Sequence, residues 1–75
     1  MKFQVSRRLV DIATIQADSY DEAASKFAKK AYGKRVQARR TTGNTGKSGM
    51  FQAYQPVKGG AGQHWTSIGE PFHVQ

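Results

Sequence analysis

The stretch Ser19-Tyr-Asp-Glu-Ala-Ala-Ser-Lys-Phe-Ala-Lys-Lys-Ala-Tyr-Gly33 decides the fold of this chain. Its apolar residues recur at the spacing of one helix face: Tyr20, Ala23, Ala24, Phe27, Ala28 and Ala31. Ser19 followed three residues later by Glu22 is a capping box, and Gly33 stands where helices commonly end. We therefore predict a helix over residues 19–32, with Phe27 as its main anchor in a core.

The segments on both sides of this helix are typical of strands. Upstream, alternating apolar residues predict two short strands at about 2–8 and 11–17, paired as a hairpin or bent near residues 9–10, although no Gly, Asn or Pro marks a turn. Downstream, strands at 36–41 and 50–57 flank a glycine-rich tip at 42–49. Period-two alternation predicts two sets in this second hairpin, the inward Val36, Ala38, Phe51 and Ala53 and the outward Gln37, Arg39, Gln52 and Tyr54.

The last part of the chain is predicted to close the sheet. Residues 58–64 are rich in glycine and are expected to form a flexible loop. Residues 65–75 resume with apolar side chains, and Pro71 suits the first residue of a closing strand. The predicted order is ββα-ββ-β, a small α+β fold with an antiparallel sheet and one amphipathic helix. We expect residues 1–75 to form one domain with a thin core, because so short a chain buries little surface.

The charge is strongly basic and unevenly placed. Twelve Lys and Arg face five Asp and Glu, giving a formal net charge of +7. Four acids fall between residues 11 and 22, whereas residues 26–47 contain no acid and eight bases: Lys26, Lys29, Lys30, Lys34, Arg35, Arg39, Arg40 and Lys47. Such an excess predicts attraction to a polyanion, and its asymmetry indicates a binding face rather than a uniform solubilising coat.

The motifs of enzymes and metal sites are missing from the sequence. Gly46-Lys47-Ser48 ends like a phosphate-binding loop, but the glycine required five positions before Gly46 is replaced by Thr41. The chain has no cysteine, and its two histidines do not stand at a metal-ligand spacing. No set of titratable groups converges as acid–base catalysis needs. We expect no enzyme activity, no cofactor, no metal and no small-molecule substrate.

Basic and aromatic residues in the second half form the candidate binding set. Arginine carries a rigid fork of donors that suits phosphate, and Arg39 is expected to face outward beside Tyr54. An exposed aromatic near arginines can stack on bases or wedge between them, which directs attention to Tyr54 and Trp65. Arg40 shares the face of Val36 and Ala38 and therefore reaches phosphate only by bending to an edge. The predicted contacts are Lys34, Arg35, Arg39, Arg40, Lys47, Tyr54, Lys58 and Trp65.

The order of these elements resembles the methanogen chromosomal protein family, small monomeric architectural DNA-binding proteins of archaea with viral relatives. The likeness covers residues 3–74 and includes the alanine-rich helix, Val36-Gln-Ala-Arg39, Met50-Phe-Gln-Ala-Tyr54, Trp65 in a loop and Ile68-Gly-Glu-Pro-Phe72. The resemblance implies a pseudo-barrel that bends duplex DNA, with Arg39, Tyr54 and Trp65 at the DNA surface. The chain departs from the family in its missing basic tail, its less basic hairpin tip and its Tyr54 in place of tryptophan.

These observations predict a largely sequence-tolerant protein that binds and bends or compacts double-stranded DNA. Single-stranded RNA on the sheet is an alternative ligand. A different class of function is a small virion or regulatory protein that binds a protein partner, such as an inhibitor of a host factor. We expect a monomer that does not associate with membranes, located inside a cell at the nucleoid or in a virus particle, because no apolar run reaches the ~20 residues that span a bilayer.

Overall fold

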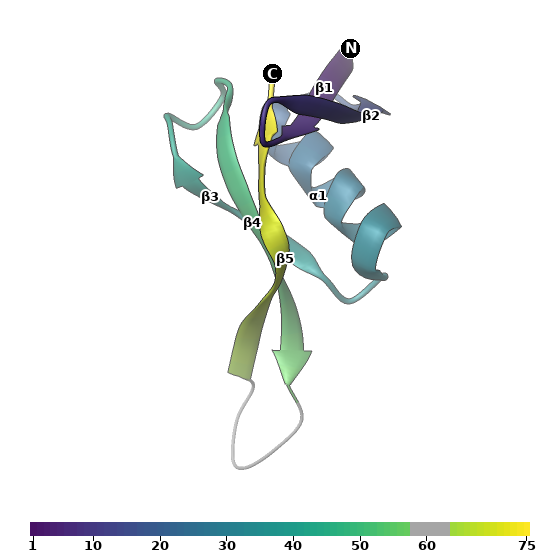
Figure 1. Cartoon of the computed structure of the whole chain (residues 1–75), viewed down its shortest axis with the longest axis vertical. Coiled ribbons are helices and arrows are strands. Elements are labelled where there is room, and N and C mark those ends of the chain that lie inside the picture. Colours follow the sequence, from purple (N-terminus) through teal and green to yellow (C-terminus); the bar gives the residue numbers. More distant parts are fainter. Residues whose placement is uncertain (58–63) are drawn as a thin grey trace.

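A computed structural model describes residues 1–57 and 64–75 and shows an α+β fold with one helix on one face of one sheet (Figure 1). Its elements are β1 (Lys2–Arg7), β2 (Val10–Gln16), α1 (Tyr20–Tyr32), β3 (Gln37–Thr42), β4 (Gly49–Val57) and β5 (His64–Val74). All strand pairs are antiparallel, in the order β2-β1-β5-β4-β3. The predicted α+β class and element order are confirmed. We call the sheet face against α1 the inner face and the opposite one the outer face.

Local sequence signals set both ends of α1. The backbone N–H of Glu22 donates to the Ser19 hydroxyl oxygen at 3.1 Å, so Ser19 caps the helix as predicted. The Glu22 carboxylate pairs with Lys26, one turn further on, at 3.1 Å. At the other end the N–H of Gly33 donates to the carbonyl of Lys29 at 3.0 Å, and Gly33 has a φ of 123° that favours glycine.

Helix α1 packs on the sheet through small alanine side chains and one large aromatic side chain. Ala23, Ala24 and Ala28 have no exposed surface, so the helix backbone lies close to the inner face. Phe27 reaches across this short gap, and its ring centroid lies 4.7 Å from that of Phe72 on β5. The core therefore depends on a few aromatic rings, with Phe27 as the helix anchor that the sequence predicts.

The sheet is open, so the prediction of a pseudo-barrel is wrong. In the described residues β2 and β3 are the two edges of the sheet and do not pair with each other. Closing a barrel would require these edges to curl together over the inner face. Helix α1 occupies that space and packs against both edge strands, so the sheet wraps the helix instead of closing on itself.

The β1–β2 hairpin turns at two residues that the sequence did not mark. Arg7 pairs with Val10, which leaves Arg8 and Leu9 as a two-residue loop. Both have positive φ, 53° and 66°, as in the turns that match the twist of a hairpin. Asn and Gly usually occupy such positions, and this is why the turn was hard to predict.

Strand β5 is longer than predicted because it contains a bulge. Phe72 is the cross-strand partner of Phe51 and Ile68 that of Ala53, so residues 69–71 face Gln52 alone. Pro71 therefore lies inside the strand rather than at its first residue. Proline has no N–H to donate to the strand ladder, and a residue inside a bulge does not need to donate one.

Gln52 supports this bulge and is buried, although it lies on the outward face as predicted. It lies on the outer face by alternation but is only 8% exposed. Its side-chain Nε2 lies 3.1 to 3.2 Å from the carbonyl oxygens of Ala53, Ile68 and Gly69. The amide thus satisfies carbonyl groups that the interrupted ladder leaves without regular partners.

Beyond the bulge, β4 and β5 continue past the C-terminal end of α1 as a two-stranded arm (Figure 1). The arm consists of residues 55–57 and 64–66, in which Pro56 pairs with Trp65 and Val57 with His64. His64 thus belongs to a strand and not to the predicted loop at 58–64, and Trp65 also lies in a strand rather than in the loop that the resemblance implied. The remainder of that predicted loop, 58–63, lies outside the described residues.

We expect Gln52→Leu to lower the free energy of unfolding by about 1–3 kcal/mol, because buried carbonyls of the bulge lose their donor. Urea unfolding followed by circular dichroism measures the change. Gln37→Leu on the exposed edge strand is the matched control and should stay within about 0.5 kcal/mol of wild type. Equal stability of the two variants would contradict the role given to Gln52.

Candidate nucleic-acid interface

Arg39 and Tyr54 meet on the outer face, as the sequence predicts. Arg39 is the cross-strand partner of Gln52, and Gln37 that of Tyr54, so the two residues lie on neighbouring strands and on the same face. The guanidinium carbon of Arg39 lies 5.2 Å from the centroid of the Tyr54 ring. This cation–π contact holds the guanidinium over an aromatic surface while the arginine side chain remains exposed.

Trp65 lies on the same face, at the start of the arm. Tyr54 pairs with Ser67, and Trp65 stands two residues from Ser67 on β5. Residues two apart on a strand share a face, so Trp65 is a diagonal cross-strand neighbour of Tyr54. Both aromatic residues are partly exposed, and each is therefore available to a ligand without unfolding of the core.

Two further cations lie beside the base of the arm. Lys34 and Arg35 are exposed in the turn that joins α1 to β3. Since β3 begins at Gln37 opposite Tyr54, this turn enters the sheet at the level of the aromatic residues. We call the set formed by Lys34, Arg35, Arg39, Tyr54 and Trp65 the arm-base surface.

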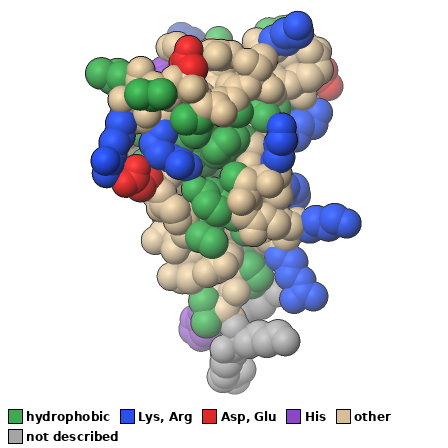
Figure 2. Space-filling model, turned by 45° about the vertical axis from the view of Figure 1, so that its right-hand side comes forward, with side chains coloured by type: hydrophobic (Ala, Val, Ile, Leu, Met, Phe, Trp, Pro, Cys, Tyr) green, Lys and Arg blue, Asp and Glu red, His purple; other side chains and the backbone are tan. Residues whose placement is uncertain are grey.

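The arm-base surface contains no acidic residue. In the view of Figure 2 the visible Asp and Glu side chains lie in the half of the molecule away from the grey segment, whereas Lys and Arg side chains extend further toward it. All five acids of the chain lie elsewhere: one in β2, one two residues before α1, two in the first turn of α1 and one in the β5 bulge. The end of the molecule near the arm is therefore the more positive one, as a polyanion site requires.

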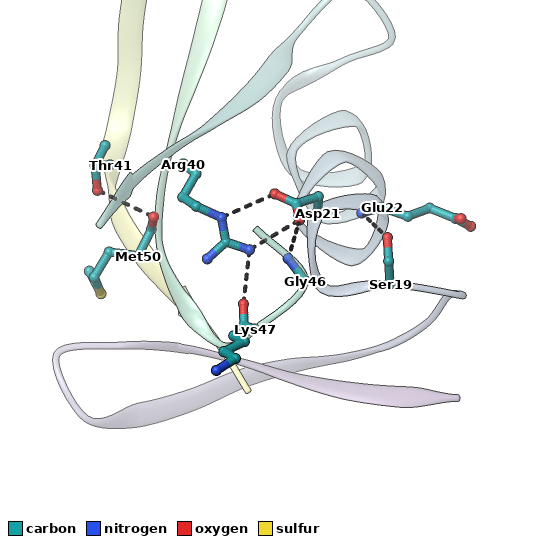
Figure 3. A network of polar contacts seen from close by, with 8 residues as sticks. All are labelled: Ser19, Asp21, Glu22, Arg40, Thr41, Gly46, Lys47 and Met50. Atoms are coloured by element: carbon teal, nitrogen blue, oxygen red, sulfur yellow. Dashed lines mark hydrogen bonds and ion pairs between the residues drawn. The ribbon is translucent and has the colours of Figure 1, made fainter. Parts of the chain in front are cut away.

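Arg40 lies apart from this surface, in an internal ion pair (Figure 3). Its side chain is only 12% exposed, and its Nε and Nη2 donate to the two carboxylate oxygens of Asp21 at 3.3 and 3.1 Å. The guanidinium carbon also lies 4.6 Å from the Phe51 ring centroid. Side chains alternate along β3, so Arg40 points to the inner face, where it contacts the Asp21 carboxylate of α1. The structure therefore does not bring Arg40 together with the arm-base surface.

Arg40 also ties the β3–β4 loop to the helix. Its Nη2 donates to the carbonyl of Lys47 at 2.8 Å (Figure 3). A Cβ atom at Gly49 would lie 2.5 Å from the backbone carbonyl oxygen of Thr42 and 2.5 Å from the Arg40 Nη1. The backbone cannot easily yield, so the strand closes beside Thr42 with glycine at that position. This explains part of the glycine content of residues 42–49 without any phosphate-binding role.

The other predicted contacts have different outcomes. Lys47 is exposed, but it lies in the loop that precedes Gly49, at the end of β4 opposite the arm. It cannot share one short ligand segment with the arm-base surface. Lys58 lies outside the described residues. Pro56 is the strand partner of Trp65 and lies beside this surface. Nothing in the sequence marks it, and only the strand register reveals its place.

No protein-family model and no curated protein matches this chain. Within residues 1–57 and 64–75, no helix is long and apolar enough to cross a membrane. In the same residues no three His, Cys, Asp or Glu side chains gather as metal ligands.

The Arg40 pair lowers the pKa of Asp21 below its ordinary value of 3.8. The hydrogen bond from Arg40 is the main cause, and the N–H of Gly46 adds to it, while partial burial acts in the opposite direction. A carboxyl with a depressed pKa in the folded state stabilises the fold above its unfolded pKa. This contribution is lost as the pH falls below 3.8 and through the lower folded pKa.

We expect Asp21→Asn to lower stability at pH 7 by about 1 kcal/mol, a modest value because the carboxylate is partly exposed. The variant should also lose less stability than wild type between pH 5 and pH 2. Thermal unfolding across this range measures both effects. Asp18→Asn is the matched control, since Asp18 is exposed. An identical pH profile for Asp21→Asn and wild type would contradict the account.

Proposed function

We propose that this protein binds double-stranded DNA through the arm-base surface, with little dependence on sequence and without catalysing a reaction. The observation that carries the proposal is the Arg39–Tyr54 contact, which places a cation and an aromatic ring together on an open sheet face. Phosphate attracts the cation, and a partly exposed ring offers a flat surface to sugars or bases. Because no acidic residue belongs to this surface, the Arg39 guanidinium and the Tyr54 ring can contact the same stretch of polyanion.

The arm supports duplex DNA as the ligand. A two-stranded β-ribbon fits the width of the major groove, and aromatic or proline side chains on such ribbons can wedge into the minor groove. Trp65 and Pro56 are cross-strand partners on the arm, where a groove would receive them. Lys34, Arg35 and Arg39 at the base of the arm would then meet the phosphates that border the groove.

Low sequence dependence follows from the chemistry of this surface. Arginine and lysine contacts to phosphate carry no base information, and stacking accepts any base. Bending or compaction of the duplex is part of the proposal, because a wedge at Trp65 would unstack a base step.

We expect log K for duplex DNA to fall with log salt with a slope of about −3, as for phosphate contacts by the three cations Lys34, Arg35 and Arg39. Arg39→Ala should weaken binding to all sequences about 5- to 30-fold and reduce the slope by about 1. Fluorescence anisotropy at several salt concentrations measures these values. Lys30→Ala removes the same charge from the exposed side of α1 and is the matched control.

A salt-independent affinity, or equal losses for Arg39→Ala and Lys30→Ala, would contradict the proposed surface. Arg39→Lys separates charge from geometry, because it retains the positive charge and loses the planar stacking on Tyr54. We expect it to bind with an intermediate affinity. Thermal unfolding of each variant shows whether the fold is unchanged.

Trp65→Ala should reduce the affinity for duplex about 5- to 150-fold, which corresponds to the ~1–3 kcal/mol of one stacking contact. It should also reduce the bend, measured by energy transfer between dyes at the two duplex ends. Competition with single-stranded RNA identifies the ligand class. Preference of the wild-type protein for the single strand would favour the alternative ligand and reject duplex DNA as the target.

A further inference from the structure

The arm has a second face, which does not belong to the arm-base surface. Side chains alternate along a strand, so His64 and Val57 point away from the face that carries Trp65 and Pro56. His64 and Val57 are strand partners at the end of the described arm, and both are exposed. Helix α1 ends at Tyr32, and the arm continues past that end (Figure 1). The His64 imidazole is therefore accessible to a ligand of the arm.

Both edges of the arm are open in the described part of the chain. Strand β1 pairs with β5 only through residues 73–74, and β3 pairs with β4 only as far as Tyr54. Residues 64–66 thus form one edge of a two-stranded ribbon. A ribbon that enters a groove of DNA has a sugar-phosphate backbone beside each of its edges. His64 would then lie next to phosphate groups, although Trp65 points to the opposite face.

The charges around His64 come from few residues. The described arm residues on β4 and β5 contain no Asp, Glu, Lys or Arg. The segment 58–63 adds one lysine and no acid to the sequence. The charged residues at the base of the arm are the three cations of the arm-base surface. The first acid further along β5 is Glu70, six residues from His64, and it is paired with Arg8. A positive imidazole on the arm therefore meets no carboxylate among the described arm residues, whereas a bound duplex would supply negative charge there.

We propose that His64 is a further DNA ligand of the arm and takes up a proton when duplex DNA binds. Imidazole is the side chain whose charge ordinarily changes between about pH 5 and 8, and its protonated form donates hydrogen bonds from both ring nitrogens. Phosphate oxygens accept such bonds. The proton comes from the buffer and returns to it on release. This role of His64 deepens the proposed function and rests on it, because the duplex supplies the negative charge.

The sign of the pH dependence follows from this proton uptake. Binding that takes up one proton becomes stronger as the pH falls, and log K changes by at most about 1 for each pH unit. The protonated imidazole also adds one phosphate contact. The slope of log K on log salt should therefore be steeper by about 0.9 at low pH than at high pH. Asp21 stays charged over this range, because its pKa lies below the ordinary value of 3.8.

The test is fluorescence anisotropy of one duplex with the full chain at about pH 5.5 and about pH 7.5, at the same salt concentration. For wild type we expect an affinity about 3- to 10-fold higher at the lower pH, as for one added charged contact. His64→Gln retains a polar side chain that carries no charge. It should bind like wild type at the higher pH and gain less than about 2-fold at the lower pH. Thermal unfolding should show the same stability, since His64 is exposed.

His73→Gln is the matched control. His73 is the other histidine of the chain, and it pairs with Met50 and Ser6 near the opposite end of β5. This variant should keep the whole gain in affinity at low pH. A duplex affinity that depends on salt but not on pH would overturn the role of His64 and leave the proposed function intact. So would an undiminished gain in His64→Gln, or a gain lost in His73→Gln. Absence of duplex binding at both pH values would overturn the proposed function together with this role.

Discussion

The close packing of α1 on one side of a five-stranded sheet is the constraint on which the rest of the molecule depends. Ala23, Ala24 and Ala28 bring the helix backbone onto the sheet, and Phe27 fills the remaining space against Phe72. Residues 1–57 and 64–75 contain one helix, and it covers only the inner face. The outer face is therefore left to water or to a partner, and its residues are free to serve binding.

Because α1 packs on only one face of the sheet, the two arginines of β3 have different roles. Arg40 points to the helix side, where Asp21 neutralises it and the β3–β4 loop folds over it. Arg39, one residue earlier, points to the outer face and stacks on Tyr54. Arg40 thus stabilises the fold, whereas Arg39 is a candidate ligand for phosphate. A strand reverses the direction of its side chains at every residue, and this alone explains the difference.

Sequence reasoning predicted the elements whose signals are local. Ser19, Gly33 and the spacing of the alanines define the helix, and alternation placed Arg39 and Tyr54 on one face. It failed where the outcome depends on distant partners. Nothing near Gln52 shows that it will support a bulge around Pro71, and nothing near Arg40 shows that Asp21 lies within reach. The turn at Leu9 was unmarked because a leucine occupies a position that usually belongs to asparagine or glycine.

We propose, above all, that a polyanion binds the outer face of the sheet at the base of the arm. Titration of the isotope-labelled protein with a short duplex, followed by amide and indole resonances, tests it residue by residue. We predict shifts concentrated at Arg39, Tyr54 and the Trp65 indole, with the exposed side of α1 around Lys30 unchanged. Shifts centred on α1, or a spectrum unaltered by duplex DNA, would contradict the claim.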